Sequence, residues 1–352
     1  MIRGYALPQL VLAALTVAVA LTLFTVGATS TATLGVYNAQ WDGTSEVRTA
    51  ASESGIPTTL VENTSTYGRT PANDSLAVVL SPTDPYGSEA QRIRSFVQSG
   101  GTLLVAEDYG PGGNELLTAV GADARIDGTP LRDEQRAGPS PAFPLASPTT
   151  NSSYTRGVDT VMLNHGTVVN PGNATTVMAS SEFSYLDRNR NEELDERELL
   201  ASRPVVTVES VGSGTVVTVS DPSVFINSML ERRDNAAFLD ALVGDHDRIL
   251  LDVSHTSALP PLVALQLALQ ESTGGMFVLA TLSILAVIVF ADPPRYLSER
   301  FGRGDTTNQT PSPSREALAS AVRDRHPEWD DERIDRVTDS LMERRQKPET
   351  DD

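Results

Sequence analysis

The chain has 352 residues, and none of them is cysteine. The absence of cysteine excludes disulfide bridges, thiolate metal sites and cysteine nucleophiles. Burial of apolar side chains must therefore hold the fold together. Hydrophobic residues make up 39% of the chain, which at this length is enough for a substantial core.

Lysine is almost absent: Lys347 is the only one, and every other basic residue is arginine. The 46 acidic residues outnumber the 27 basic ones, which gives a formal net charge of −19. Such a balance opposes binding to phosphate backbones, so we expect no nucleic-acid partner. Exposed carboxylates keep a surface hydrated and self-repelling in concentrated salt, so the composition is typical of a halophile.

Charge is missing from two long apolar segments. No charged residue occurs between Arg3 and Asp42, and residues 7–28 are long enough to cross about 30 Å of hydrocarbon. A cleaved signal peptide is the alternative for this segment. The second segment, residues 272–291, has a charged residue directly on each side. The sequence therefore predicts two transmembrane helices, with the lipid bilayer as a partner.

The positions of the arginines predict the orientation of these segments. Three arginines closely follow the second segment, whereas no basic residue lies between Arg248 and Ser272. We therefore expect a two-pass protein of the cell membrane, with residues 1–6 and 292–352 cytoplasmic and an extracellular domain at 32–255. In the tail, residues 306–314 are predicted to be a linker. Residues 315–345 are predicted to be helical, either as a docking element or as a solvated tail.

Between the two apolar segments, buried-type runs alternate with amphipathic stretches. This alternation predicts an α/β fold with a mostly parallel, flavodoxin-like sheet flanked by helices. Residues 127–154 lack periodicity and are predicted to run over the surface. The expected strands are 33–37, 58–61, 76–80, 102–105, 160–169, 175–179, 205–209, 215–220 and 248–253, and the expected helices are 43–54, 88–98, 114–120, 224–232 and 236–243.

Acidic residues follow several of the predicted strands. Ligands of open parallel sheets bind outside the carboxyl ends of the strands, so residues there are candidates for ligand binding. Short polar residues at these points also begin loops and cap helices, which is the alternative. The candidates are Asp42, Asp84, Asp108 and Asp221.

Residues 187–198 have the spacing of a calcium-binding loop, with oxygen-bearing side chains at positions 1, 3, 5, 9 and 12. Glu192 occupies position 6, where the sharp turn prefers glycine, and strand-like segments replace the helices of an EF-hand. We therefore expect a structural Ca²⁺ loop that is not an EF-hand; the alternative is a solvated acidic turn. The predicted ligands are Asp187, Asn189, Asn191, Glu193 through its carbonyl, Asp195 and Glu198.

Three stretches resemble the family named domain of unknown function 4350, in its haloarchaeal type. They are Phe96-Val-Gln-Ser-Gly-Gly-Thr-Leu-Leu-Val105, Phe183-Ser-Tyr-Leu-Asp187, and residues 214–227 followed by Asp234-Asn235. The resemblance covers most of residues 34–255 and implies a fold similar to class I glutamine amidotransferase-like domains. Those amidotransferases use a cysteine nucleophile, which this chain lacks. Members are often encoded beside MoxR-type ATPases, which implies a role in an envelope assembly or secretion system.

No catalytic motif accompanies the histidines or serines of the predicted domain, so we assign no catalytic residue. We expect a membrane-anchored, exported binding or assembly module, stabilised by calcium and non-catalytic. The alternative is a hydrolase of an envelope polymer or glycan that uses carboxylates such as Asp42, Asp108 or Asp221.

Overall fold

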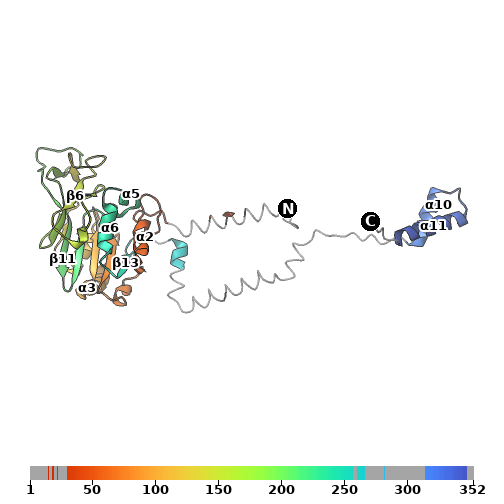
Figure 1. Cartoon of the computed structure of the whole chain (residues 1–352), viewed down its shortest axis with the longest axis horizontal. Coiled ribbons are helices and arrows are strands. Elements are labelled where there is room, and N and C mark those ends of the chain that lie inside the picture. Colours follow the sequence, from red (N-terminus) through yellow and green to blue (C-terminus); the bar gives the residue numbers. More distant parts are fainter. Residues whose placement is uncertain are drawn as a thin grey trace. The chain divides into compact units, whose positions relative to one another are not determined.

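The structure is a computed structural model. It describes residues 30–256, 260–265 and 314–346, together with residues 15, 18, 19, 22 and 281. The chain divides into two compact units, residues 1–275 and residues 276–352. Figure 1 shows the first unit as a sheet with helices packed on it, and the second as a pair of helices.

The two segments predicted to cross a membrane, residues 7–28 and 272–291, lie outside the described residues except for single positions. Within the described part of the chain, no helix combines the length and the apolar content that a membrane crossing needs. The longest described helix, α11 (Asp331–Gln346), has 16 residues and is rich in charge, whereas a crossing takes about 20 apolar residues. The prediction of two transmembrane helices, with the two-pass location that depends on it, is therefore wrong for the described chain.

The first unit is built on a nine-stranded sheet with the order β1-β13-β2-β3-β12-β11-β9-β6-β7. The five strands from β1 to β12 in this order are parallel, and the remaining pairings are antiparallel. The α/β class is confirmed, and the sheet is mixed. The strands are β1 (Thr58–Val61), β2 (Ser75–Leu80), β3 (Thr102–Ala106), β6 (Leu145–Pro148), β7 (Val161–Met162), β9 (Thr175–Ser180), β11 (Pro204–Val211), β12 (Gly214–Val219) and β13 (Arg248–Asp252).

The parallel half places the last strand of the chain, β13, between β1 and β2. Its order matches the flavodoxin-like order 2-1-3-4-5 if β13 takes the place of the first strand. The predicted strand at residues 33–37 is absent. Its backbone groups bond locally, from Gly35 N to Ala32 O and from Asn38 N to Gly35 O, and Leu34 has a φ of +60°. This segment is therefore a series of turns, and the place of the first strand in the flavodoxin-like order is taken by β13.

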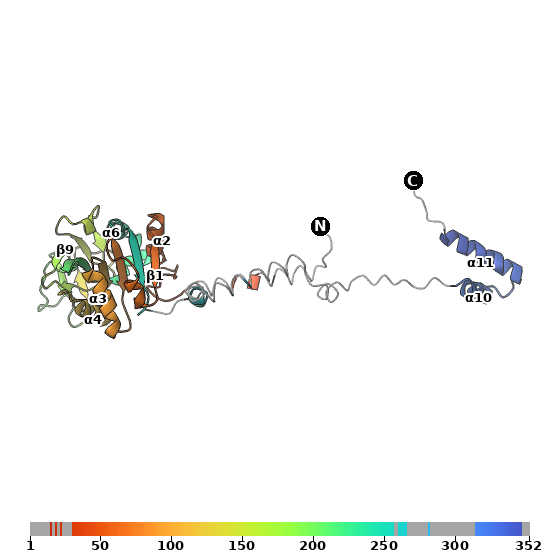
Figure 2. The same ribbon diagram turned by 90° about the horizontal axis from the view of Figure 1, so that it is seen from below.

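Helices cover both faces of the sheet (Figure 2). On one face, α3 (Ala90–Gln98) and α4 (Gly112–Val120) share a core cluster with alternate side chains of β2 and β3. On the other face, α2 (Ser45–Glu53) and α6 (Asn235–Val243) pack on the opposite set of side chains. Strands buried on both faces explain why β2 and β3 are continuous apolar runs. The predicted helix at 224–232 is instead a 3₁₀ turn, η4 (Pro222–Phe225), followed by α5 (Asn227–Leu230).

The segment expected to run over the surface, residues 127–154, contains strands. Besides β6 it includes β5 (Leu131–Asp133), which pairs with β10 (Ser184–Leu186). The predicted strand 160–169 is also divided, into β7 and β8 (Val169–Asn170), and β8 pairs with β4 (Arg125–Ile126). These two small sheets bring distant parts of the chain to the carboxyl end of the parallel strands.

The second unit consists of α10 (Arg315–Arg325) and α11. Ile334 is 1% exposed and lies in the contact between the two helices. Trp329, at the turn between them, stacks on His326 at 4.1 Å and lies under the guanidinium of Arg333 at 4.7 Å. Of the predicted linker 306–314, only Ser314 is described, and its hydroxyl caps α10 by accepting from Ala317 N.

Candidate functional site

Four polar side chains stand where parallel strands of the sheet end. Ser81 follows β2, Glu107 follows β3, Asp221 comes two residues after β12, and Asp252 is the last residue of β13. The three acids are buried. Burying a carboxylate is costly unless hydrogen bonds compensate, so the partners of each acid decide what it does.

The structure places the four aspartates of the sequence prediction in different settings. Asp42 lies in the turns before α2, where its carboxylate accepts from Thr33 and Asn38 at 3.0 Å each. Asp84 is exposed, in a loop whose backbone donates to His255 O. Only Asp108 and Asp221 come together, each two residues after the end of one of the neighbouring strands β3 and β12.

Asp221 is fully buried, and backbone amides satisfy both of its oxygens. Oδ2 accepts a hydrogen bond from Asn164 N at 2.5 Å, and Oδ1 accepts one from Ser223 N at 2.7 Å. The second bond caps the N-terminus of η4. Burial raises the pKa of Asp221 to about 7 despite these bonds, and the nearby Asp108 contributes. The carboxyl group thus ties the segment 164–168 to the end of β12.

Glu107 was not singled out by the sequence analysis, although it lies two residues after the predicted strand 102–105 and directly follows β3. Its side chain is 1% exposed. Oε1 accepts from Ser81 Oγ at 3.1 Å, from Asp108 N at 3.0 Å and from Gly110 N at 3.2 Å. Oε2 has no hydrogen-bond partner among the described residues. Burial is the largest cause of a raised pKa for this carboxyl.

Asp252 is the centre of a second buried cluster, at the end of β13. Its carboxylate accepts from Tyr67 Oη at 2.6 Å and from Ser254 Oγ at 2.6 Å. Ser254 Oγ also lies 2.9 Å from His255 Nδ1, and the ring of Tyr86 stacks on that imidazole at 3.9 Å. Burial raises the pKa of Asp252. The cluster anchors the loops that follow β13 and β2 to each other.

The predicted calcium loop begins with a buried ion pair. Asp187 is fully buried, and its Oδ2 accepts from Arg132 Nε at 2.8 Å and from Glu192 N at 3.1 Å. Arg132 Nη2 also lies 3.2 Å from Glu192 Oε1. A guanidinium therefore supplies positive charge at the first predicted ligand, where a cation would have to compete with it.

The other predicted ligands lie close together. The side-chain amides of Asn189 and Asn191 both donate to Asp195 Oδ2, at 2.6 and 3.0 Å. Glu198 accepts from the backbone N–H groups of Arg188 and Asp195. The oxygens of the same two amides accept backbone N–H groups, Asn189 Oδ1 from Asn191 N at 3.3 Å and Asn191 Oδ1 from Glu193 N at 3.0 Å. A bound cation would have to displace these bonds to reach the amide oxygens. Within the described residues, no three acidic or histidine side chains are arranged to hold a metal, so the amide oxygens would be needed.

The loop reaches the carboxyl edge of the sheet through Arg190. Its guanidinium lies 5.7 Å from the ring centre of Tyr109 and donates to Gly128 O at 3.3 Å. Tyr109 follows β3, and its hydroxyl donates to His165 O. Tyr109 therefore closes the edge between β3 and β12, with Arg190 covering its ring.

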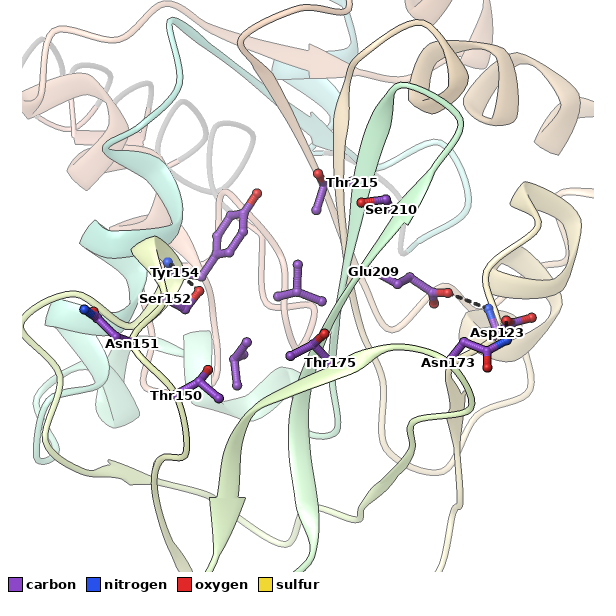
Figure 3. Close-up of a pocket in the computed structure, with 12 residues that line it drawn as sticks. Asp123, Thr150, Asn151, Ser152, Tyr154, Asn173, Thr175, Glu209, Ser210 and Thr215 are labelled. Atoms are coloured by element: carbon purple, nitrogen blue, oxygen red, sulfur yellow. Dashed lines mark hydrogen bonds between the residues drawn. The ribbon is translucent and has the colours of Figure 1, made fainter.

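A polar cleft of about 540 Å³ lies at the other end of the strands (Figure 3). Figure 3 shows Tyr154 and Ser152 on one side of β11, with Asp123 and Asn173 on the other. Glu209 points to Asp123, and its Oε2 accepts a hydrogen bond from Asp123 N at 2.8 Å. The further lining residues are Thr150, Asn151, Thr175, Val177, Val208, Ser210 and Thr215.

The five parallel strands, helices on both faces and an antiparallel extension define an α/β domain with an open mixed sheet. The profile of the family described as domain of unknown function (DUF4350) matches residues 36–243. The chain belongs to this family. A search of curated proteins found no match.

The solved structures that match this chain are only distantly similar to it. The N-terminal domain of mmIFT52 is 15% identical, with 51% of this chain and 78% of that chain covered and a TM-score of 0.40. The cytoplasmic protein STM1381 from Salmonella typhimurium LT2 is 13% identical, with 58% and 87% covered and a TM-score of 0.38. A β-galactosidase from Bacillus circulans sp. alkalophilus is 15% identical, with 48% and 22% covered and a TM-score of 0.29. The chain thus spans 22% of that enzyme's length, and no function follows from these similarities.

Proposed function

We propose that this protein is a binding or assembly module whose α/β unit recognises a partner or small ligand in the polar cleft. The observation that supports this most is the set of unused polar groups in the lining. Within the described part of the chain, the hydroxyls of Tyr154, Ser210 and Thr215 and the amide of Asn151 form no hydrogen bond with other protein groups. A few convergent polar groups beside an aromatic ring are typical of ligand sites.

The charge of the cleft restricts the ligand. Asp123 and Glu209 are its two acidic lining residues, and no basic residue lines it. Asn173 donates to Asp123 at 2.5 Å, which holds that wall in place. We therefore infer a neutral, hydroxyl-rich ligand or a cationic one, because an anion would face uncompensated like charge. For a macromolecular partner, the family resemblance favours a component of a MoxR-type ATPase system.

Calorimetric titration with neutral disaccharides and with spermidine tests this proposal. The matched variants are Ser210→Arg, at an exposed lining position, and Ser153→Arg, at an exposed position outside the lining. Binding by the wild type and by Ser153→Arg, but not by Ser210→Arg, would support the cleft. Equal binding by all three proteins, or none by the wild type, would reject it as the site for these ligands.

We also propose that the loop 187–198 binds a structural Ca²⁺ ion through Asn189, Asn191, Asp195, Glu198 and the carbonyl of Glu193. The side chains of Asn189 and Asn191 both lie within 3.0 Å of Asp195 Oδ2, so three of these candidate ligands are already close together. Asp187 fits less well, because Arg132 already neutralises it. The expected affinity is therefore lower than that of a loop with a free carboxylate at position 1.

Glycan hydrolysis by a carboxylate pair has less support than binding. Both oxygens of Asp221 accept hydrogen bonds from backbone N–H groups. The carboxylate of Asp42 accepts hydrogen bonds from side chains of its own turns. Glycosidases need two carboxyl groups that flank the scissile bond. These two aspartates instead have the bonding of residues that hold loops.

A further inference from the structure

Ser81 has an unusual backbone conformation for its position. It directly follows β2, a strand that is buried along its whole length, and its φ is +43°. Residues other than glycine rarely adopt such a φ. Residues with a strained backbone of this kind cluster at functional sites. Ser81 N donates to Ala106 O at 2.8 Å, which fixes the residue at the end of the sheet. Its side chain is partly exposed.

The hydroxyl of Ser81 is bonded to a buried carboxyl group. Oγ lies 3.1 Å from Glu107 Oε1, and Glu107 Oε2 is one of the few buried side-chain atoms in the described chain without a partner. A Cβ on Gly110 would come within 2.7 Å of Oε2, so glycine there lets the loop close over the carboxyl. A desolvated carboxylate is a stronger base than one in water, as the raised pKa of Glu107 indicates.

The N-terminus of α4 lies against the same turn. A Cβ on Gly112 would lie 2.1 Å from Pro82 O, so the first residue of this nine-residue helix packs directly on the residue after Ser81. The first N–H groups of a helix have no intrahelical acceptor. Pro111, the N-cap residue, provides no side-chain cap. The uncapped N-terminus of α4, with the positive end of its helix dipole, thus lies beside the residue that follows Ser81.

We propose that Ser81 is the nucleophile of an acyl-transfer site, with Glu107 as its general base and the first N–H groups of α4 as donors to the oxyanion. Its substrate class is an ester with an acyl group small enough to reach the strand end. This activity goes beyond the binding role and does not depend on the polar cleft. The location agrees with the rule that ligands of open α/β sheets bind outside the carboxyl ends of the strands.

The reaction balances with these groups alone. Glu107 accepts the Oγ proton while Oγ bonds to the acyl carbon, and the bond from that carbon to the leaving oxygen breaks. The leaving alkoxide takes the proton from Glu107. Water then attacks the acyl carbon while Glu107 takes a proton from the water. The bond from that carbon to Oγ breaks, Oγ takes the proton from Glu107, and the carboxylic acid is released.

Ser254 provides a matched control. Like Ser81 it donates to a buried carboxylate near the end of a parallel strand, at 2.6 Å from Asp252 Oδ1, and it also contacts His255. It has no positive φ and belongs to the cluster that joins two loops. We therefore expect no nucleophilic role for Ser254.

Labelling of the full chain with an alkyl fluorophosphonate, followed by peptide mass spectrometry, tests the proposal. In this reaction Oγ bonds to phosphorus and fluoride leaves. We expect one adduct, on Ser81, which is absent in Ser81→Ala and unchanged in Ser254→Ala. Glu107→Gln should slow labelling by about 100-fold, the scale of a lost general base.

Glu107→Asp serves as a second variant if the glutamine substitution impairs folding, because it keeps the charge and shortens the reach. It should also label slowly. An unlabelled Ser81 in the folded wild type, or labelling of Ser81 at the wild-type rate in a folded Glu107 variant, would overturn the proposal. Neither outcome bears on ligand binding in the cleft, which the Ser210→Arg comparison reports separately.

Discussion

Arg132 Nε lies 2.8 Å from Asp187 Oδ2, and this pair joins β5 to the start of the acidic loop. Asp187 is fully buried and the Arg132 side chain is only 10% exposed, so water screens the pair weakly. The pKa of Asp187 balances two effects. Burial raises it, whereas the hydrogen bonds from Arg132 and from the backbone of Glu192 lower it by more, so the pKa of Asp187 lies below its ordinary value.

Replacing Arg132 with alanine should destabilise the α/β unit strongly. The change leaves a buried carboxylate without its cation, which costs about 3–5 kcal/mol. Because the folded pKa of Asp187 is depressed, the pair stabilises the fold above pH ~4 and loses its effect as the pH falls through the folded pKa. Urea unfolding at pH 7 and at acidic pH measures both. Arg188→Ala, at an exposed neighbour, is the control and should cost about 0.5 kcal/mol or less.

Removing calcium should lower the melting temperature if the loop is a metal site. At a free concentration 100 times the dissociation constant, a bound ion adds about 2.7 kcal/mol to the stability. Asp195→Ala removes the carboxylate on which both asparagine amides converge, so calcium should no longer shift its midpoint. Glu196→Ala changes an exposed carboxylate at a position that is not a predicted ligand, and its calcium shift should remain. A wild-type midpoint that is the same in calcium and in chelator would show that the loop is a solvated turn.

The sequence predicted the parallel strands best where they are buried on both faces. Residues 76–80 and 102–105 correspond to β2 and β3 within one residue at each end. Both strands are buried along their whole length, and a short continuous apolar run is typical of such a strand. The run at 33–37 has similar apolar content. It is not a strand because local hydrogen bonds around Gly35 use its backbone groups.

Strands that depend on distant partners were harder to predict. β5 includes Arg132 and Asp133, which are buried because Arg132 pairs with Asp187 and because Asp133 accepts from Ser181 and from backbone N–H groups. No local periodicity shows that these charges will be satisfied by residues about 50 positions later. The same holds for the place of β13, which is set by pairing with β1 and β2.

At the carboxyl edge, the sequence located the strand ends but not the residues with unusual surroundings. Asp108 and Asp221 were selected as acids after strands, whereas Glu107, one position before Asp108, is the more deeply buried of the two acids that follow β3. The signal available was that Glu107 directly follows a buried run. The positive φ of Ser81 has no counterpart in composition or spacing, since serine gives no warning of it.

Asp221 should make stability depend on pH above the acidic range. Its folded pKa of about 7 lies above the unfolded value of about 3.9. A carboxyl group whose pKa is higher in the folded state contributes to stability, and this contribution is complete at pH values below the unfolded pKa. It is lost as the pH rises through the folded pKa. The stability difference between the wild type and Asp221→Asn should therefore change by up to about 4 kcal/mol between pH 4 and pH 8.

Urea unfolding of both proteins at several pH values checks this expectation, and the ¹³C shift of the Asp221 carboxyl reports its titration directly. Asp240→Asn, at an exposed position on α6, is the control and should give a difference that varies little with pH. A carboxyl midpoint near 4 would mean that Asp221 is better solvated or better hydrogen-bonded than its burial indicates.

Two glycine-to-alanine substitutions should differ sharply in their effect on stability. A Cβ on Gly214 would lie 2.1 Å from Val97 O and 2.2 Å from Gly101 O. Both atoms belong to the backbone where α3 ends, so they cannot move aside as a flexible side chain would. Gly214→Ala must push α3 away from β12, and we expect a loss of about 3 kcal/mol. A Cβ on Gly68 meets no atom within 4 Å and its φ is not positive, so Gly68→Ala should be neutral or add about 0.5 kcal/mol by restricting the unfolded chain. Chemical denaturation of the two variants beside the wild type measures the contrast, and similar midpoints for both would contradict the close packing of α3 on β12.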